Sequence, residues 1–397
     1  MILCGIDRLL AQAHRLAGRP YGLLGHTAAV TRDLVPTHVA LAASAAGSPA
    51  ALFGPEHGYY AVEQDMVASA DERDPFTGAP ISSLYGDAVH SLKPRPDAFR
   101  GLEVLLIDLQ DIGTRYYTFA ATAVWAAEAA LEAGLEVWLL DRPNPLGGTI
   151  HEGNSIQEGY ASFVGALDLP VRHGLTLGEI LRLEGKRRGW PGDRLEVFLV
   201  KGWKRRMSWP EIGRTWIAPS PNMPSHAAAL VYPGGCLIEA TELSEGRGTT
   251  RPFELAGAPG LDPLALSRAL DELLLPGVKF LPTFFKPQFQ KHAGKVCGGV
   301  QLIVDDPAAF RSYRTGIELL RLMKEQLGAA FSWRVAPYEF VSDRAAIDLL
   351  TGSTELCTAL ETGDRALAAE RLEAFYRKFR HDEDRFSIER RDILLYD

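Results

Sequence analysis

Four short apolar segments are spaced along the first half of the chain, and this spacing restricts the possible fold more than any other feature. They are "YGLLG" (21–25), "AALFG" (50–54), "LEVLLID" (102–108) and "LEVWLLD" (135–141). Between the last two, the Ala-rich stretch 117–134 has the composition of a helix and closes at a glycine. Apolar strands that alternate with helices are typical of a parallel sheet covered by helices. We therefore expect an α/β N-terminal domain.

The alternation stops where the chain becomes rich in proline, at "PSPNMP" (219–224). Before it, Thr176 and Glu179 have the spacing of a capping box and predict a helix start. After it, we expect helices at about 262–275, 307–327 and 364–379 and a strand at 298–304. These elements predict a smaller α+β domain, with domains at 1–230 and 231–397.

Polar residues follow the predicted strands. Glu56 and His57 come directly after the second strand and stand between Pro55 and Gly58, while the third and fourth strands run into "LQDIGTRYY" and "RPNPLGG". Ligands of open parallel sheets bind beyond the carboxyl ends of the strands. We therefore expect these loops to face one crevice, although a solvated turn would also explain the acid at position 56.

The most concentrated polar stretch of the chain is "EATELSEGRGTTRPFE" (239–254), with four glutamates and two arginines. A solvated charged loop is one interpretation. The stretch begins at the expected domain junction, however, and its small residues would let backbone N–H groups approach a ligand. We therefore expect it to lie over the crevice.

Composition and spacing argue against several classes of protein. A net charge of −8 and a pI near 5.8 do not suit a general nucleic-acid binder. The four cysteines form no C-x-x-C pair, no metal-ligand spacing occurs, and no G-x-G-x-x-G follows the first strand. We expect no metal and no cofactor. No apolar run is long enough for a membrane span, and the N-terminal residues lack the pattern of a secretion signal, which predicts a cytoplasmic protein.

Carboxylates in a cleft fit glycoside hydrolysis, and they fit many binding proteins too. The motifs "LFGPEHG", "SLYG" (83–86), "DLQDIGTRYYTF", "LDRPNPLGG", "SFVGALDLPVRHGLTLGE", "PSPNMP" and "YPGGCLIEATELSEGRGTTRPFE" are more specific. Together they closely resemble the bacterial exo-β-N-acetylmuramidase family, over nearly the whole chain and in the same order. The resemblance implies a Rossmann-like N-terminal domain and an active cleft at the domain interface. It also implies release of terminal N-acetylmuramic acid (MurNAc) from the non-reducing end of peptidoglycan fragments such as MurNAc-GlcNAc and muropeptides.

The resemblance carries the favoured catalytic residue of the family onto Glu56, as general acid or acid/base. For the partner carboxylate we expect Glu245 or Glu242, with Asp111 third, while the 2-acetamido group of the substrate is an alternative nucleophile. The same motifs supply the expected substrate-binding residues His57, Asp111, Arg115, Tyr116, Asp141, Asn144, Asn222, Arg247 and Arg251.

Selectivity for MurNAc requires a group that binds its lactyl carboxylate, and an arginine suits that task. We expect Arg247 to do so, ahead of Arg251 and Arg115. The chain has "EGN" (152–154) where relatives tend to have E-G-P, which predicts an altered loop at the edge of the sugar site. A non-catalytic muropeptide-binding or sensing protein is the alternative function. The intact Glu56 and "ELSEGRGTTR" favour the enzyme.

Overall fold

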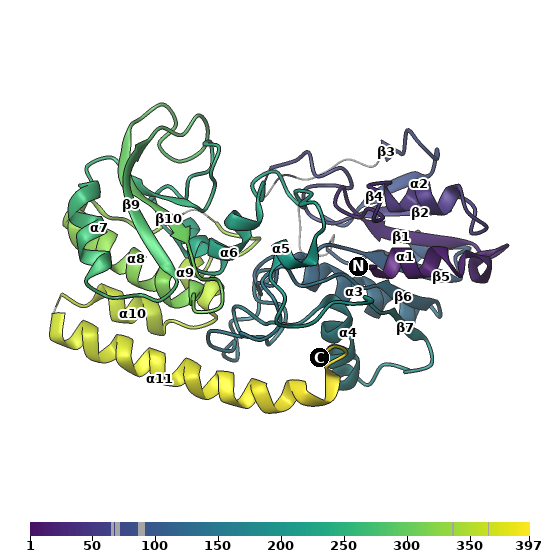
Figure 1. The fold of residues 1–397 in the computed structure, drawn as a ribbon. Coiled ribbons are helices and arrows are strands. Elements are labelled where there is room, and N and C mark those ends of the chain that lie inside the picture. Colours follow the sequence, from purple (N-terminus) through teal and green to yellow (C-terminus); the bar gives the residue numbers. More distant parts are fainter. Residues whose placement is uncertain (65–66, 68–71, 86–91, 336, 364) are drawn as a thin grey trace.

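The computed structural model describes residues 1–397 except 65–66, 68–71, 86–91, 336 and 364, so Gly86 of the "SLYG" motif lies outside the described residues. Figure 1 shows two lobes, with the N-terminal sheet in one and a smaller sheet in the other. The long helix α11 (Arg365–Glu389) runs beneath both lobes.

The described part of the N-terminal lobe contains a seven-stranded sheet in the order β3-β4-β2-β1-β5-β6-β7. The strands are β1 (Tyr21–Gly25), β2 (Ala51–Gly54), β3 (Glu72–Arg73), β4 (Pro80–Ser83), β5 (Val104–Asp108), β6 (Glu136–Leu140) and β7 (Leu195–Phe198). All neighbours pair in parallel except β3 with β4. The four strands predicted from the sequence are confirmed, with ends that differ by two residues at most.

Side chains of these strands alternate between two buried faces. On one face, residues such as Leu23 and Leu106 pack with α1 (Gly5–Leu10) and α2 (Thr37–Ala42). On the other, Leu24 and Ile107 pack with α3 (Phe119–Glu132) and α4 (Leu177–Arg188). The sheet is therefore covered by helices on both sides, and its polar loops gather at one edge.

Each of the predicted helices is present. The capping box at Thr176 and Glu179 opens α4, α7 spans Pro263–Asp271, and α8 spans Ser312–Leu327. Helix α11 is ten residues longer than expected at its C-terminal end. The shorter helices are α5 (Trp209–Ile212), α6 (His226–Gly235), α9 (Ala346–Thr351) and α10 (Glu355–Glu361).

The C-terminal lobe is built on an antiparallel sheet in the order β8-β10-β9, with β8 at Leu255–Ala258, β9 at Val278–Phe285 and β10 at Cys297–Val304. Helix α6 packs closely on α8, because Gly234 and Gly316 face each other. A Cβ added to Gly316 would lie 2.3 Å from the carbonyl oxygen of Gly234. This close crossing sets the position of the 3₁₀ turn Cys236–Ala240, which follows α6 directly.

The end of the chain returns to the first lobe. After α11, the Tyr396 hydroxyl donates to Asp141 Oδ2 at 2.5 Å, and the amide of Leu395 donates to Glu179. The expected boundary at residue 230 lies inside α6. Asn154 lies in the core of the lobe junction, where its amide group donates to the carbonyl of Thr351 and its Oδ1 accepts from Tyr313. Asn154 therefore contributes to the packing of the lobe junction.

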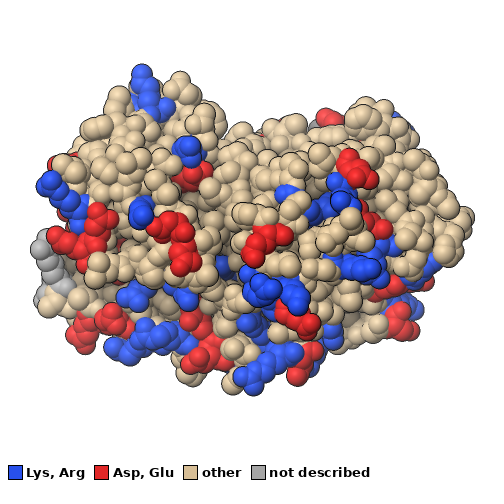
Figure 2. All heavy atoms as spheres, in the orientation of Figure 1, with Lys and Arg blue, Asp and Glu red and all other residues tan. Residues whose placement is uncertain are grey.

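Figure 2 shows acidic and basic side chains intermingled along the lower half of this face. None of the described helices is both long enough and apolar enough to cross a membrane.

Candidate active site

A narrow pocket of about 40 Å³ lies between the two lobes. Three carboxylates, one arginine and several aromatic side chains line it. Its polar and aromatic members are Glu56, His57, Tyr116, Tyr117, Thr118, Ser220, Asn222, Tyr232, Glu239, Arg247, Phe253, Tyr338 and Glu339. The loops after β2 and β5 therefore meet the 239–254 stretch, as the sequence predicted.

Glu56 is held on a tight turn at the end of β2. The amide of Gly58 donates to the carbonyl of Pro55 at 3.0 Å, and a Cβ on Gly54 would lie 2.6 Å from the amide nitrogen of Tyr59. The Thr118 hydroxyl donates to Glu56 Oε2 at 2.7 Å. Thr118 occupies the N-cap of α3 but makes no side-chain bond to that helix. Its hydroxyl positions the carboxylate instead.

His57 has a φ of 72°, in the left-handed region that non-glycine residues rarely adopt. Its Nδ1 lies 3.0 Å from the carbonyl oxygen of Glu63. Consecutive side chains of extended backbone point to opposite sides. The left-handed conformation of His57 breaks that alternation, and both Glu56 and His57 line the pocket.

Two further carboxylates come from the C-terminal lobe. Glu239, in the turn after α6, accepts from the Tyr338 hydroxyl at 2.9 Å and lies 2.9 Å from Arg247 Nη1. Glu339 accepts from the Tyr85 hydroxyl at 3.3 Å, which links it to the first lobe. Its φ of 45° is again left-handed. Both carboxylates are buried beside the pocket.

Arg247 is buried between two acids. Its Nη1 lies 2.9 Å from Glu239 and 3.1 Å from Glu245, and its guanidinium lies over the ring of Phe253 at 4.9 Å. Arg247 is the one arginine among the described residues that line this pocket. It therefore places a positive charge at the wall of the pocket and holds Glu239 in place.

The expected partner carboxylates, Glu245 and Glu242, lie outside the pocket lining. Glu242 is exposed and does not line the pocket. Glu245 is buried behind Arg247, and Lys291 Nζ lies 2.7 Å from it. Burial would raise the pKa of Glu245, but Lys291 and Arg247 outweigh it and lower that pKa to about 2. Glu245 is therefore ionised at neutral pH and lies outside the pocket lining, which suits a supporting role.

Tyr116, Tyr117 and Asn222 complete the N-terminal wall. The Tyr116 hydroxyl donates to the carbonyl of Pro233, and Asn222 donates to Gln64 Oε1 at 2.8 Å. Burial raises the pKa of Tyr117 well above its usual range, and the nearby carboxylates of Asp111 and Glu56 raise it further. This phenol is therefore neutral and can donate a hydrogen bond.

The other expected binding residues stabilise loops. Asp111 accepts from the amide of Gly113 at 2.6 Å and lies 3.3 Å from His173 Nε2, and it does not line the pocket. Arg115 donates to the carbonyls of Asn154, Leu169 and Leu350. Its guanidinium group is buried with three backbone acceptors, and Arg115 does not line the pocket.

Asp141, Asn144 and Arg251 also lie outside the pocket lining. Asp141 accepts from Thr176 and from the amide of Gly178 at the start of α4, and burial raises its pKa to about 6. Asn144 closes a turn by accepting from the amide of Leu146. Arg251 pairs with Glu254 at 3.0 Å, and its side chain is 53% exposed.

Comparison with known proteins identifies the family. Residues 21–227 match the family described as "Exo-beta-N-acetylmuramidase NamZ, N-terminal", and residues 230–396 match its C-terminal counterpart. The chain belongs to this family. It is 38% identical over 396 residues to "Peptidoglycan beta-N-acetylmuramidase NamZ" of Bacillus subtilis (strain 168), a match that covers 99% of this chain and 91% of the relative.

Two solved structures of DUF1343 family proteins from Bacteroides fragilis NCTC 9343 have the same fold. They superpose with TM-scores of 0.86 and 0.75 at 31% and 25% identity, and each match covers 100% of this chain and 99% of the other. The resemblance inferred from the motifs and the expected fold class are therefore confirmed.

Glu239 and Glu339 were not among the catalytic residues expected from the sequence. Glu239 belongs to the polar stretch 239–254, but it lies outside the "ELSEGRGTTR" segment of that stretch. Glu339 lies in "APYEF" (336–340), where no motif marks it. In the described part of the chain, no three His, Cys, Asp or Glu residues are grouped closely enough to hold a metal ion.

Proposed function

We propose that this chain is an exo-acting glycoside hydrolase that releases terminal β-linked MurNAc from the non-reducing end of peptidoglycan fragments, including MurNAc-GlcNAc and muropeptides. Membership of the NamZ family supports this activity. The observation that carries the proposal is the pocket between the lobes, which combines Glu56 from the first lobe with Glu239, Glu339 and Arg247 from the second.

Glu56 acts as the general acid. Glycosidic bond cleavage requires a proton donor at the leaving oxygen and, in most families, a second carboxylate on the other side of the sugar. The Thr118 hydroxyl fixes one oxygen of Glu56, and the Pro55 turn makes its backbone rigid. Such fixed placement is what proton transfer in a transition state requires.

Glu239 is the second carboxylate, in preference to Glu339. Arg247 and the Tyr338 hydroxyl hold Glu239 from two directions, and a cation at 2.9 Å favours its ionised form. An ionised carboxylate can attack the anomeric carbon, activate water, or orient the 2-acetamido group of the substrate. Addition of azide to Glu239→Ala separates these roles, since glycosyl azide of the inverted anomer forms when a protein nucleophile is replaced.

Arg247 binds the lactyl carboxylate, which distinguishes MurNAc from GlcNAc. It is buried, it lines the pocket, and its planar fork suits a carboxylate. The pocket volume of about 40 Å³ is well below the roughly 300 Å³ of common ligand sites. A saccharide therefore requires the walls to separate, including the contact between Tyr85 and Glu339.

The test is hydrolysis of chromogenic β-MurNAc and β-GlcNAc substrates without added metal or nucleotide. Wild type should release chromophore from β-MurNAc preferentially and in the presence of EDTA. Glu56→Gln should lower kcat by roughly 100-fold or more, because general acid catalysis contributes ~10² to 10⁴. Muropeptide binding without hydrolysis would favour the alternative of a sensing protein. Near wild-type turnover by Glu56→Gln would mean that Glu56 has only a structural role in its turn.

A further inference from the structure

A second cavity, of about 300 Å³, lies at the carboxyl ends of β1, β5 and β6. Its walls come from residues 28–34 after β1, from Gln110 after β5, from Arg142 after β6 and from the segment 209–217. β1 lies between β2 and β5, so the loops after β1 and β5 turn to opposite sides of the sheet. Such switch points are where open α/β sheets bind their ligands.

This cavity is separate from the active-site pocket, with which it shares no lining residue among those described. His26 contacts Gln110 of the cavity wall and Pro219, which precedes Ser220 of the active-site pocket. Its Nε2 accepts from the amide of Gln110 at 2.9 Å, and its Nδ1 lies 3.4 Å from the carbonyl of Pro219. Burial and Arg142 lower the pKa of His26 to about 3, so the ring is neutral and adds no charge to either side.

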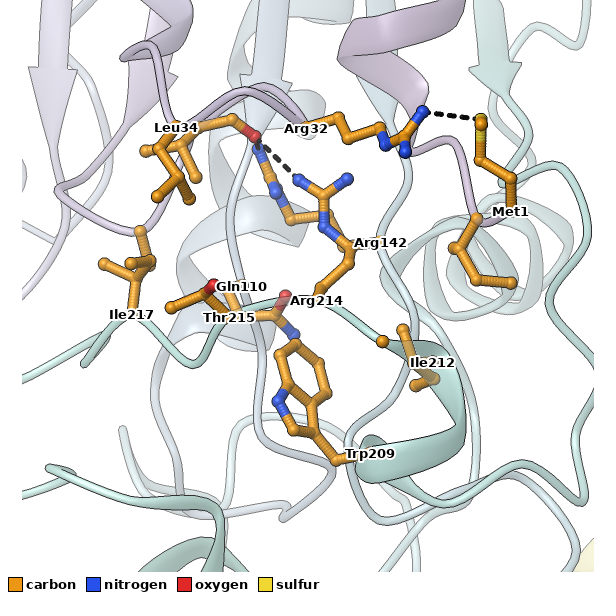
Figure 3. A pocket seen from close by; sticks show the side chains of 14 residues that line it. Met1, Arg32, Leu34, Gln110, Arg142, Trp209, Ile212, Arg214, Thr215 and Ile217 are labelled. Carbon is orange, nitrogen blue, oxygen red and sulfur yellow. Dashed lines mark hydrogen bonds between the residues drawn. The ribbon is translucent and has the colours of Figure 1, made fainter.

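Three arginines line the cavity, and Figure 3 shows their side chains in its upper half. Arg142 is buried and binds Asp108 through two nitrogens, at 2.6 and 2.9 Å. Arg214 lies 3.3 Å from Asp7. Both arginines donate to the carbonyl of Val30, at 3.0 and 3.2 Å, so their guanidinium groups lie side by side.

Arg32 is the third cation, and it is exposed. Within the described part of the chain, its guanidinium finds only the thioether sulfur of Met1, which is a weak acceptor and carries no charge. Asp7 pairs with Arg214 and Asp108 with Arg142, whereas the guanidinium of Arg32 has no carboxylate partner within the described residues.

The lower walls of the cavity are apolar. Trp209 and Ile212 of α5 face the arginines across the cavity, with Ile217 at one side (Figure 3). Apolar walls exclude water, which strengthens the attraction of an ion to the guanidinium groups. A volume of about 300 Å³ suits a small molecule with one ring.

We propose that this cavity binds a small organic anion, whose carboxylate or phosphate group pairs with Arg32 and Arg214 and whose ring or apolar body lies against Trp209. Arg142 has a structural role in the cavity wall, because Asp108 and the carbonyl of Val30 occupy its donors. The absence of a G-x-G-x-x-G motif after β1 argues against a dinucleotide as the ligand.

Binding of benzoate and phenyl phosphate at constant ionic strength tests the proposal, with benzamide as the uncharged control. Titrations use calorimetry and tryptophan fluorescence. We expect saturable binding of at least one of the two anions, with a fluorescence change that Trp209→Phe removes. Arg32→Gln should weaken binding tenfold or more, as expected for a lost charge-assisted hydrogen bond. The matched control is Arg268→Gln, an exposed arginine of α7.

Several outcomes would overturn the proposal: benzamide binding as tightly as benzoate, equal effects of Arg32→Gln and Arg268→Gln, or no binding of either anion at millimolar concentration. Binding of phenyl phosphate alone identifies a phosphate site, and binding of benzoate alone a carboxylate site. Hydrolysis of the chromogenic β-MurNAc substrate by Arg32→Gln should match wild type, so this experiment fails or succeeds independently of the proposed activity.

Discussion

Glu239 and Glu245 form a matched pair that tests the assignment of the second carboxylate. Both lie within 3.1 Å of Arg247 Nη1, both are buried, and only Glu239 lines the pocket. Glu239→Gln removes the charge proposed to act at the anomeric carbon. We expect kcat/KM on the β-MurNAc substrate to fall by ~10² to 10⁴, the range typical of acid–base groups. Glu245→Gln should lower it less than about tenfold.

Stability provides a second comparison of the two variants. The pKa of Glu245 is about 2 against an ordinary 4.5, and this difference corresponds to about 3 kcal/mol of unfolding free energy at neutral pH. That contribution is complete above about pH 4.5 and is lost as the pH falls toward 2, so Glu245→Gln should flatten the acid side of the stability profile. Glu239→Gln leaves Arg247 paired with Glu245 and should cost about 1 to 3 kcal/mol.

The two measurements are chemical denaturation between pH 2 and 8 and steady-state kinetics at neutral pH, where the folded fraction of each variant is known. Equal losses of activity in both folded variants would mean that Arg247, rather than Glu239, is the group on which turnover depends. Near wild-type activity of Glu239→Gln would refute the assignment and leave Glu339 as the remaining carboxylate of the C-terminal wall.

Two further changes follow from buried charges. Arg247→Lys keeps a cation between Glu239 and Glu245 but loses the planar fork, so MurNAc over GlcNAc selectivity should fall about 10- to 100-fold, while Arg251→Lys, an exposed control, leaves it unchanged. Burial raises the pKa of Glu383 in α11 from 4.5 to about 7, so the stability it contributes is present below about pH 4.5 and is lost as the pH rises through 7. Glu383→Gln should therefore be more stable than wild type at pH 8 by roughly 1 to 3 kcal/mol, and an equal midpoint in denaturation at pH 8 would contradict this.

The sequence predicted those features that depend on local patterns. Strand β5 and the capping box of α4 follow from apolar runs and spacing, and the turn at Glu56 follows from its flanking Pro55 and Gly58. Glu239 and Glu339 could not be chosen this way. Glu239 reaches the pocket because α6 and α8 cross closely, and Glu339 reaches it through a left-handed turn, and neither has a short-range signal.

Polar residues at the ends of strands account for several of the expected binding residues that lie outside the pocket lining. Asp141 and Asn144 follow β6, where a ligand site was expected, yet they accept from backbone amides at the start of α4 and in their own turn. Buried amide and carbonyl groups must find partners, and short polar side chains at strand ends are well placed to supply them. In sequence, such residues look the same as those that bind a substrate.

Arg115 and Tyr116 show how the loop after β5 serves both purposes. The two residues are adjacent, but Arg115 donates to three carbonyls in the lobe junction, among them Leu350 at the end of α9, while Tyr116 lines the pocket. The buried, charged guanidinium group of Arg115 therefore ties the loop to the C-terminal lobe. It also fixes the position of Tyr116, whose hydroxyl donates to the carbonyl of Pro233. Glu56 and His57 both line the pocket, and the left-handed φ of His57 breaks the alternation of an extended chain between them. Tyr116, Tyr117 and Thr118 line it without such a conformation, so a loop that also holds two lobes together can anchor through one residue and line the site with those that follow.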